Sequence, residues 1–288
     1  MDILYHYCST ASFHAIIESH ALWLSSLSLS NDTMEGKLVA SAIARLAERD
    51  SLDQDSLRRI QDAIGILEKD YDGLGFCLSE DSDLLSQWRG YAENATGVSI
   101  GFSSEYLKWL SSENRSRDIP GFTLAKVAYE PSAHDASVAP TYLKVKDLIA
   151  AGALKMLGRR SLLTDTRTDE EIERDNASIW SAAWNLFGDT LGLLPELFRL
   201  KAPAFREERE WRLISYLVKG GEDHCSHRVV HDRVIPYRKI ELIEFERHPI
   251  AEVILGPRHG TPPEIVQNFL QLNGYGLVKV RPSEASYR

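Results

Sequence analysis

Apolar and polar residues alternate in the stretch ILYHY, residues 3–7, and short apolar runs bounded by turn residues recur at 73–79, 96–103 and 251–258. A period of two places successive side chains on opposite faces, as in a half-buried β-strand. Ser9 follows the first of these stretches and is placed to cap a helix. The pattern therefore predicts strands near both ends of the chain.

Elsewhere apolar residues recur every three or four positions, which is the pattern of an amphipathic helix. Residues 57–67 carry such a stripe, and residues 138–200 show no strand pattern. We predict an α+β fold with a mostly antiparallel sheet core and helical insertions at about 33–70 and 138–200. The chain length favours one elaborated domain, residues 1–288.

Composition and charge disfavour several classes of protein. The net charge of −9 disfavours a surface devoted to nucleic acid, because phosphate contacts need clustered Lys and Arg. No apolar run approaches the roughly 18 residues of a transmembrane helix, and MDILYHYCST does not resemble a signal peptide. The widely separated Cys8, Cys77 and Cys225 do not suit a disulfide framework. We expect a cytoplasmic protein that does not associate with a membrane.

The most charged candidate for chemistry is FREEREWRLIS, residues 205–215. Taken as a strand, it places Glu208, Glu210 and Arg212 on one side and Trp211 on the other. Two interpretations stay open at this point. The polar side is either a solvated edge dressed with ion pairs or the wall of a polar site that polarises a sugar hydroxyl.

Two further stretches admit both a structural and a functional interpretation. His6 in LYHYCS is either a core histidine satisfied by a backbone carbonyl or a neutral imidazole that binds a ligand hydroxyl. Trp88, Arg89 and Tyr91 lie within about one helical turn of each other in SEDSDLLSQWRGYA. They either pack a helix on the core or offer an aromatic platform for a flat ring, with Arg89 near a phosphate.

Four ordered blocks resemble a bacterial family known only as domain of unknown function 2971. Its members begin LYHYTS and continue with LWLS, NDP and a Glu, and this chain reads LYHYCST…LWLS…NDTME. FCLSEDSDLLSQWRGYAENATGVSIGF, EREWR and VILGPR are similar to the later blocks. Cys8, Thr33 and Gln87 depart from the usual Thr, Pro and Met.

The opening strand with a histidine and the later glutamates also resemble, more distantly, the ADP-ribosyltransferase superfamily. This resemblance implies an ADP-ribosyltransferase-like fold with Glu210 as the catalytic carboxylate and Glu208 completing an E-x-E pattern. It implies NAD as the substrate, with His6 binding the nicotinamide-side ribose and Tyr91 or Trp88 stacking on nicotinamide. The implied NAD-binding residues are His6, Tyr7, Trp88, Arg89, Tyr91 and Arg212.

On this hypothesis His6 and Glu210 share a cleft, no metal is required, and ADP-ribose passes to an unknown protein or nucleic acid acceptor. The protein would then be a toxin or phage-defence effector, with an antitoxin or defence partner. One alternative is a metal-dependent nuclease or hydrolase that uses Glu35, Glu208 and Glu210. Another is a non-catalytic nucleotide-binding module of a defence system.

Overall fold

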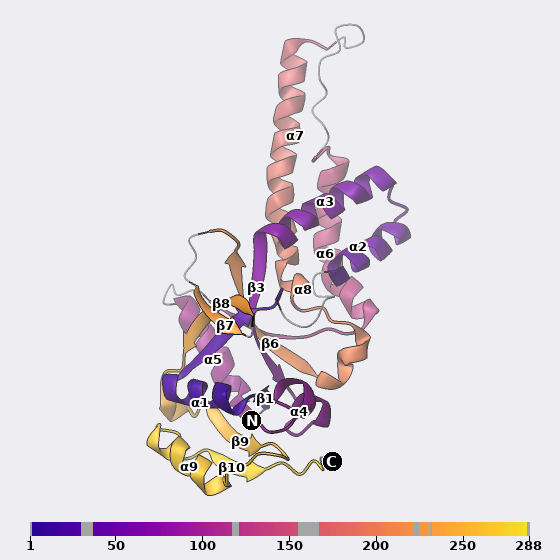
Figure 1. Ribbon diagram of the computed structural model, residues 1–288. Coiled ribbons are helices and arrows are strands. Elements are labelled where there is room, and N and C mark those ends of the chain that lie inside the picture. Colours follow the sequence, from indigo (N-terminus) through magenta and orange to yellow (C-terminus); the bar gives the residue numbers. More distant parts are fainter. Residues whose placement is uncertain are drawn as a thin grey trace. The chain divides into compact units, whose positions relative to one another are not determined.

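The computed structural model describes residues 2–29, 37–116, 121–154, 167–221, 225–230 and 232–286. They form a mixed structure of helices and a mostly antiparallel sheet (Figure 1), which confirms the coarse fold prediction. The chain divides into two compact units, each built from separate chain segments. The first unit comprises residues 1–31, 72–127 and 204–288, and the second comprises residues 32–71 and 128–203.

The strands of the sheet follow the order β10-β9-β4-β1-β3-β2-β8-β7, while β6 pairs with β3 and β5. Their bounds are β1 Ile3–Cys8, β2 Ala21–Ser26, β3 Tyr71–Ser79, β4 Val98–Ser103, β5 Thr123–Lys126, β6 Glu210–Val218, β7 Ser226–Val230, β8 Arg233–Glu241, β9 Ile250–Leu255 and β10 Lys279–Pro282. The β9–β10 pair is parallel. The pairs of β1 with β3 and β4, and of β2 with β3 and β8, are antiparallel.

The helices of the first unit are α1 Thr10–Ser19, α4 Leu85–Tyr91, α5 Ser104–Ser116 and α9 Pro263–Leu272, with short 3₁₀ turns η2 Pro203–Glu208 and η3 Phe245–Arg247. Ser9 caps α1 as expected, because its hydroxyl accepts the backbone N–H of Ser12 at 3.0 Å.

The sheet of the first unit has two distinct faces. One face, which we call the core face, carries Leu4, Phe76, Leu78, Ile100 and Leu213 and packs with apolar residues of α1, α5 and α9. Tyr5 and Tyr7 alternate with Leu4 along β1, so they point to the opposite face, where they pack with Trp88 of α4. We call this second face the α4 face.

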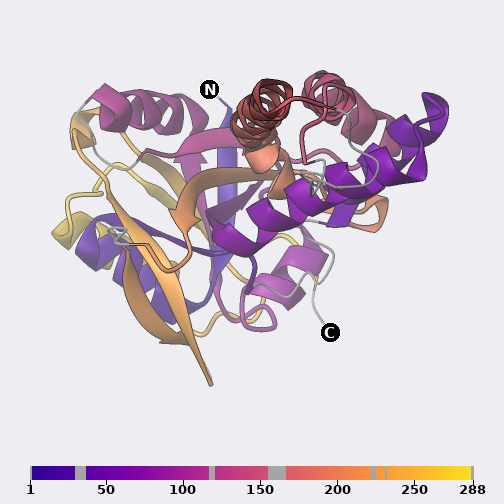
Figure 2. The same ribbon diagram turned by 90° about the horizontal axis from the view of Figure 1, so that it is seen from above.

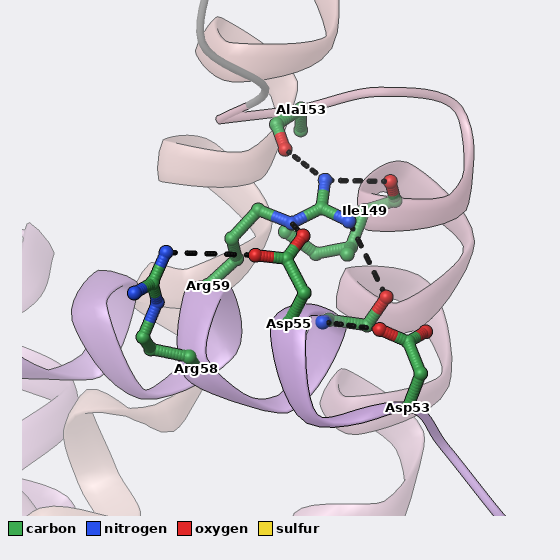
Figure 3. A network of polar contacts seen from close by, with 7 residues as sticks. Asp53, Asp55, Arg58, Arg59, Ile149 and Ala153 are labelled. Carbon is green, nitrogen blue, oxygen red and sulfur yellow. Dashed lines mark hydrogen bonds and ion pairs between the residues drawn. The ribbon is translucent and has the colours of Figure 1, made fainter.

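The second unit is helical, with α2 Lys37–Arg49, α3 Gln54–Asp70, α6 Pro131–Ala150, α7 Asp169–Thr190, the 3₁₀ turn η1 Leu191–Leu193 and α8 Leu194–Leu197. Buried Arg59 of α3 donates to the carbonyl oxygens of Ile149 (3.3 Å) and Ala153 (3.1 Å) at the end of α6, and pairs with Asp55 at 3.1 Å (Figure 3). None of the helices in the described ranges is both long and apolar enough to cross a membrane.

These helices occupy the regions for which we expected insertions at about 33–70 and 138–200, although α6 already begins at Pro131. The single-domain organisation stays a prediction. Strands β7 and β8 form an antiparallel hairpin (Figure 2, orange), in which Val230 pairs with Arg233.

Candidate functional site

The charged stretch 205–215 is not one continuous strand. Glu208 ends the 3₁₀ turn η2, and Glu210 begins β6. Arg209 between them has a φ of 42°, in the left-handed region that L-residues seldom adopt. The expectation that Glu208 lies on the strand face of Glu210 is therefore wrong, since the chain turns at Arg209 before the strand starts.

Glu210 and Arg212 do share one strand face, and both are buried. Arg212 donates from Nε and from a terminal nitrogen to the two carboxylate oxygens of Glu210, at 2.7 Å and 3.1 Å. Their side chains are only 6% and 2% exposed, respectively. The interpretation as a solvated edge is therefore wrong. Two parallel N–H donors instead fix the orientation of the Glu210 carboxylate.

Glu208 is also buried and receives a hydrogen bond from Tyr91, whose hydroxyl lies 3.2 Å from its Oε1. The Ser79 hydroxyl donates to the Glu208 carbonyl at 2.7 Å and so fixes its backbone to the end of β3. Tyr91 remains 47% exposed at the end of α4. The pairs Tyr91–Glu208 and Glu210–Arg212 are neighbours along the chain where it enters β6, and we call these four residues the carboxylate cluster.

His6 does not belong to this cluster. Its ring stacks on Phe76 with centroids 3.9 Å apart, and Nδ1 donates to the Cys77 carbonyl at 2.8 Å. Burial lowers the pKa of His6 to about 4, so the ring is neutral at physiological pH. His6 therefore packs on the core face with a backbone carbonyl as its partner, as the structural interpretation proposed.

His6 and Glu210 point to opposite faces of the sheet. His6 contacts Phe76 of the core face, whereas Glu210 alternates with Trp211 and Leu213, which pack into that same core. The prediction that His6 and Glu210 share a cleft is wrong. The physical reason is that His6 alternates with Tyr5 and Tyr7, and those two rings occupy the α4 face.

Trp88 is completely buried, which leaves no aromatic face for a ligand ring. Its indole N–H donates to Asp83 at 2.6 Å, and its ring meets Tyr7 edge-on with centroids 4.9 Å apart. Burial favours a raised pKa for Asp83, but hydrogen bonds from Ser283 and Trp88 lower it overall. The expectation of a platform on Trp88 is wrong, and core packing is confirmed.

Tyr7 is a buried structural residue rather than a surface for a ligand. Its hydroxyl donates to the Asp81 carbonyl and accepts the backbone N–H of Leu84, both at 2.9 Å. It thereby fixes the loop that leads into α4. Arg89 is exposed on α4, and its predicted contact with phosphate stays a prediction.

The residues that position the cluster are not among those expected from the sequence. Ser79 anchors the Glu208 backbone, and Arg209 forms an ion pair with Asp81. The signal was the polar run Ser79, Glu80 and Asp81 directly after an apolar strand. Glu35, a member of the alternative metal site, lies outside the described residues. Within the described ranges no three His, Cys, Asp or Glu residues converge as a metal site.

Comparison with known proteins gives one family match. No curated protein and no solved structure matches the chain. A model of the family described as "Protein of unknown function (DUF2971)" matches residues 87–213, a range that starts in α4 and ends in β6. All four members of the carboxylate cluster fall in this range, and the match supports the resemblance to the DUF2971 family.

Proposed function

We propose that the protein cleaves the nicotinamide–ribose bond of NAD at the carboxylate cluster and transfers ADP-ribose to an acceptor. The observation that carries the proposal is the pair of buried carboxylates at the start of β6. Glu210 is oriented by two donors from Arg212, and Glu208 is bonded to the half-exposed Tyr91. The distant resemblance to ADP-ribosyltransferases supports the choice of NAD.

The chemistry needs negative charge beside the ribose. As the C–N bond breaks, its electron pair leaves with nicotinamide, and positive charge builds on the ribose in an oxocarbenium-like transition state. A carboxylate held in place before the reaction stabilises this charge without reorganisation. Glu210 has this role in the proposal, and the acceptor then bonds to the ribose carbon and loses its proton to water.

The structure changes the residues assigned to NAD binding. His6 points to the core face and stacks on Phe76, and Trp88 is fully buried, so neither supplies a ligand surface beside the carboxylate cluster. Tyr91 is the aromatic residue left for nicotinamide, because its ring is half exposed and its hydroxyl reaches Glu208. Arg212 acts as a positioning residue through Glu210.

The Glu210–Arg212 pair argues against the alternative of a metal-dependent hydrolase. A divalent cation held by Glu208 and Glu210 would have to displace a guanidinium from both oxygens of Glu210. That displacement would leave the buried Arg212 without its carboxylate, which is strongly destabilising. In ADP-ribosyl transfer the pair can stay in place, because each Glu210 oxygen keeps a lone pair that can accept a ribose hydroxyl.

The direct test is to incubate the purified protein with NAD and to quantify free nicotinamide by chromatography, with and without bacterial protein or RNA as acceptor. The proposal expects nicotinamide release that rises with one class of acceptor, together with ADP-ribose bound to that class. NAD binding without release would instead identify a non-catalytic nucleotide-binding module. Neither binding nor release would reject NAD as the ligand.

A further inference from the structure

A second group of residues on the first unit places a cation over one aromatic ring and close to another. The Arg228 guanidinium of β7 lies 5.8 Å from the centre of the Trp23 ring. Trp23 lies beside Tyr237, with centroids 5.3 Å apart and rings tilted by 36°. All three side chains are partly exposed. We call Trp23, Arg228 and Tyr237 the aromatic platform.

Arg228 differs from the other cations of the hairpin. Lys239 pairs with Glu241 at 3.6 Å and Arg233 with Asp232 at 4.0 Å. Arg238 donates to Ser215 and to the Tyr216 carbonyl. Arg228 forms no hydrogen bond or ion pair with any residue in the described ranges, and its Nε is buried without a partner.

Burial lowers the pKa of Arg228, because its charge is partly removed from water and no carboxylate in the described ranges pairs with it. A buried donor without an acceptor is unfavourable in a folded protein. A bound anion would supply that acceptor. Guanidinium groups suit phosphate especially well, because their planar donors match its oxygens.

The strand register places the three side chains of the aromatic platform on one face of the sheet. Trp23 lies opposite Lys239, and Tyr237 lies opposite both Ser25 and Ser226. Arg228 is two residues from Ser226 on the same strand, so its side chain lies on the same face. Leu22, Leu24 and Ile240 alternate with these residues and pack into the core on the other side.

The same face leads toward the carboxylate cluster. Ser25 lies opposite Gly75 of β3, and Ser79, four residues farther along β3, lies opposite Tyr5 of the α4 face. The Ser79 hydroxyl donates to the carbonyl of Glu208. Leu27 covers β3 closely at Gly75. A Cβ at position 75 would lie only 2.5 Å from Leu27 Cδ2, so a larger residue there would collide with Leu27.

We propose that the aromatic platform binds a nucleotide, with the base stacked on Trp23 and Tyr237 and a phosphate on Arg228. Aromatic faces stack on any base, and an adjacent unpaired arginine supplies the anion contact. If the proposed function holds, this ligand is the adenylate half of NAD, and that assignment rests on the proposed function. Binding at the aromatic platform requires only a ligand with a base that stacks and a phosphate that contacts Arg228, whether or not the protein cleaves NAD.

The test is isothermal titration calorimetry with AMP, with adenosine and ribose 5-phosphate in separate titrations. We expect AMP to bind more tightly than either fragment. Arg228→Gln and Trp23→Leu should each weaken AMP binding by roughly 10-fold or more, as expected for a charge-assisted contact or a stacked base. Arg228→Lys, which keeps the charge, should retain part of the affinity.

Arg233→Gln is the matched control, because Arg233 lies on the same hairpin and already pairs with Asp232. Its affinity for AMP should stay within about twofold of the wild-type affinity, because substitutions at surface positions usually have small effects. Thermal melting verifies that each variant is folded. AMP binding that is absent in wild type, or unchanged in both Arg228→Gln and Trp23→Leu, would overturn the platform.

The two proposals fail separately. If NAD is never cleaved but Arg228→Gln still loses AMP affinity, the platform stands and the proposed function falls. If NAD is cleaved with the same KM by wild type and Arg228→Gln, the proposed function stands and the assignment of the platform to the adenylate half of NAD falls. An increase in KM for NAD with little change in kcat in Arg228→Gln supports both.

Discussion

At the scale of single residues, the partly buried His6 couples the stability of the first unit to pH. Burial lowers its pKa from the ordinary 6.5 to about 4. The unfolded chain therefore takes up a proton at His6 between these two values, whereas the folded chain does not. The contribution of His6 to stability is complete above pH 6.5 and is lost as the pH falls toward 4.

We expect the free energy of unfolding of the wild type to fall by about 2 kcal/mol more than that of His6→Gln between pH 7 and pH 5. Glutamine does not titrate, and its amide can still donate to the Cys77 carbonyl. Urea unfolding at the two pH values measures the difference. Equal losses in both proteins would show that His6 titrates normally and is not enclosed in the core.

Single residues also differ in whether their place in the candidate site could be predicted from the sequence. Alternation along 210–213 correctly places Glu210 and Arg212 together, because Trp211 and Leu213 need the core. Alternation in LYHYC could not show that His6 takes the core face, since Tyr5 and Tyr7 are equally able to fill a core. The left-handed Arg209 has no sequence signal of the kind that glycine gives, so the turn before β6 was missed.

At the scale of elements, Arg59 connects α3 to the end of α6 inside the second unit. It donates to the Ile149 carbonyl in the last turn of α6, which also accepts the Gly152 N–H at 3.0 Å, and to the Ala153 carbonyl just beyond the helix. The neighbouring Arg58 is 73% exposed and contacts only Asp55, at 3.5 Å, among the residues drawn in Figure 3. The two arginines therefore differ in environment but not in chemistry or helix propensity.

Arg59→Met should lower the free energy of unfolding by about 2–4 kcal/mol, because two buried carbonyls lose charged donors. Arg58→Met should change it by less than about 0.5 kcal/mol. Chemical denaturation of the two variants beside wild type measures both effects. Similar small effects at both positions would mean that Arg59 does not cap α6.

Element boundaries follow the local signals where those signals are strong. Ser9 marks the start of α1, and the apolar stripe in 57–67 marks α3, because capping and burial act over a few residues. The β7–β8 hairpin could not be predicted from the sequence, because the two residues between Val230 and Arg233 are not the Asn-Gly or Asp-Gly pair typical of a tight hairpin. The pairing of β6 with β3 and β5 joins distant segments, which no local pattern encodes.

At the scale of the whole molecule, neither compact unit is a continuous piece of chain. The second unit joins residues 32–71 to 128–203, so the chain passes between the units four times. Unfolding one unit while the other stays folded would leave long closed loops anchored at both ends. We therefore expect both units to unfold together, as the single-domain prediction requires.

This expectation is tested by urea unfolding followed by two probes, far-UV circular dichroism for the helices and tryptophan fluorescence. Coincident transitions are the mark of a two-state process. In Arg59→Met both curves should shift together to lower urea concentration. A helical transition that separates from the fluorescence transition would show that the two units are independent domains.

The central claim is that Glu210 stabilises the transition state of NAD cleavage. Glutamine keeps the shape and one acceptor of Glu210 but removes its charge. The change also weakens the contact with the buried Arg212, so we expect it to cost about 1–3 kcal/mol of stability. Nicotinamide release must therefore be measured well below the melting temperature, with NAD affinity determined on the same sample.

The decisive measurement compares the rate of nicotinamide release by wild type, Glu210→Gln and Glu244→Gln. Glu244 is the control, because its half-exposed carboxylate also pairs with an arginine, Arg247, at 2.8 Å. We predict that Glu210→Gln binds NAD as wild type does but releases nicotinamide roughly 100-fold more slowly or worse, while Glu244→Gln keeps the full rate. A folded Glu210→Gln that releases nicotinamide at the wild-type rate would contradict the claim.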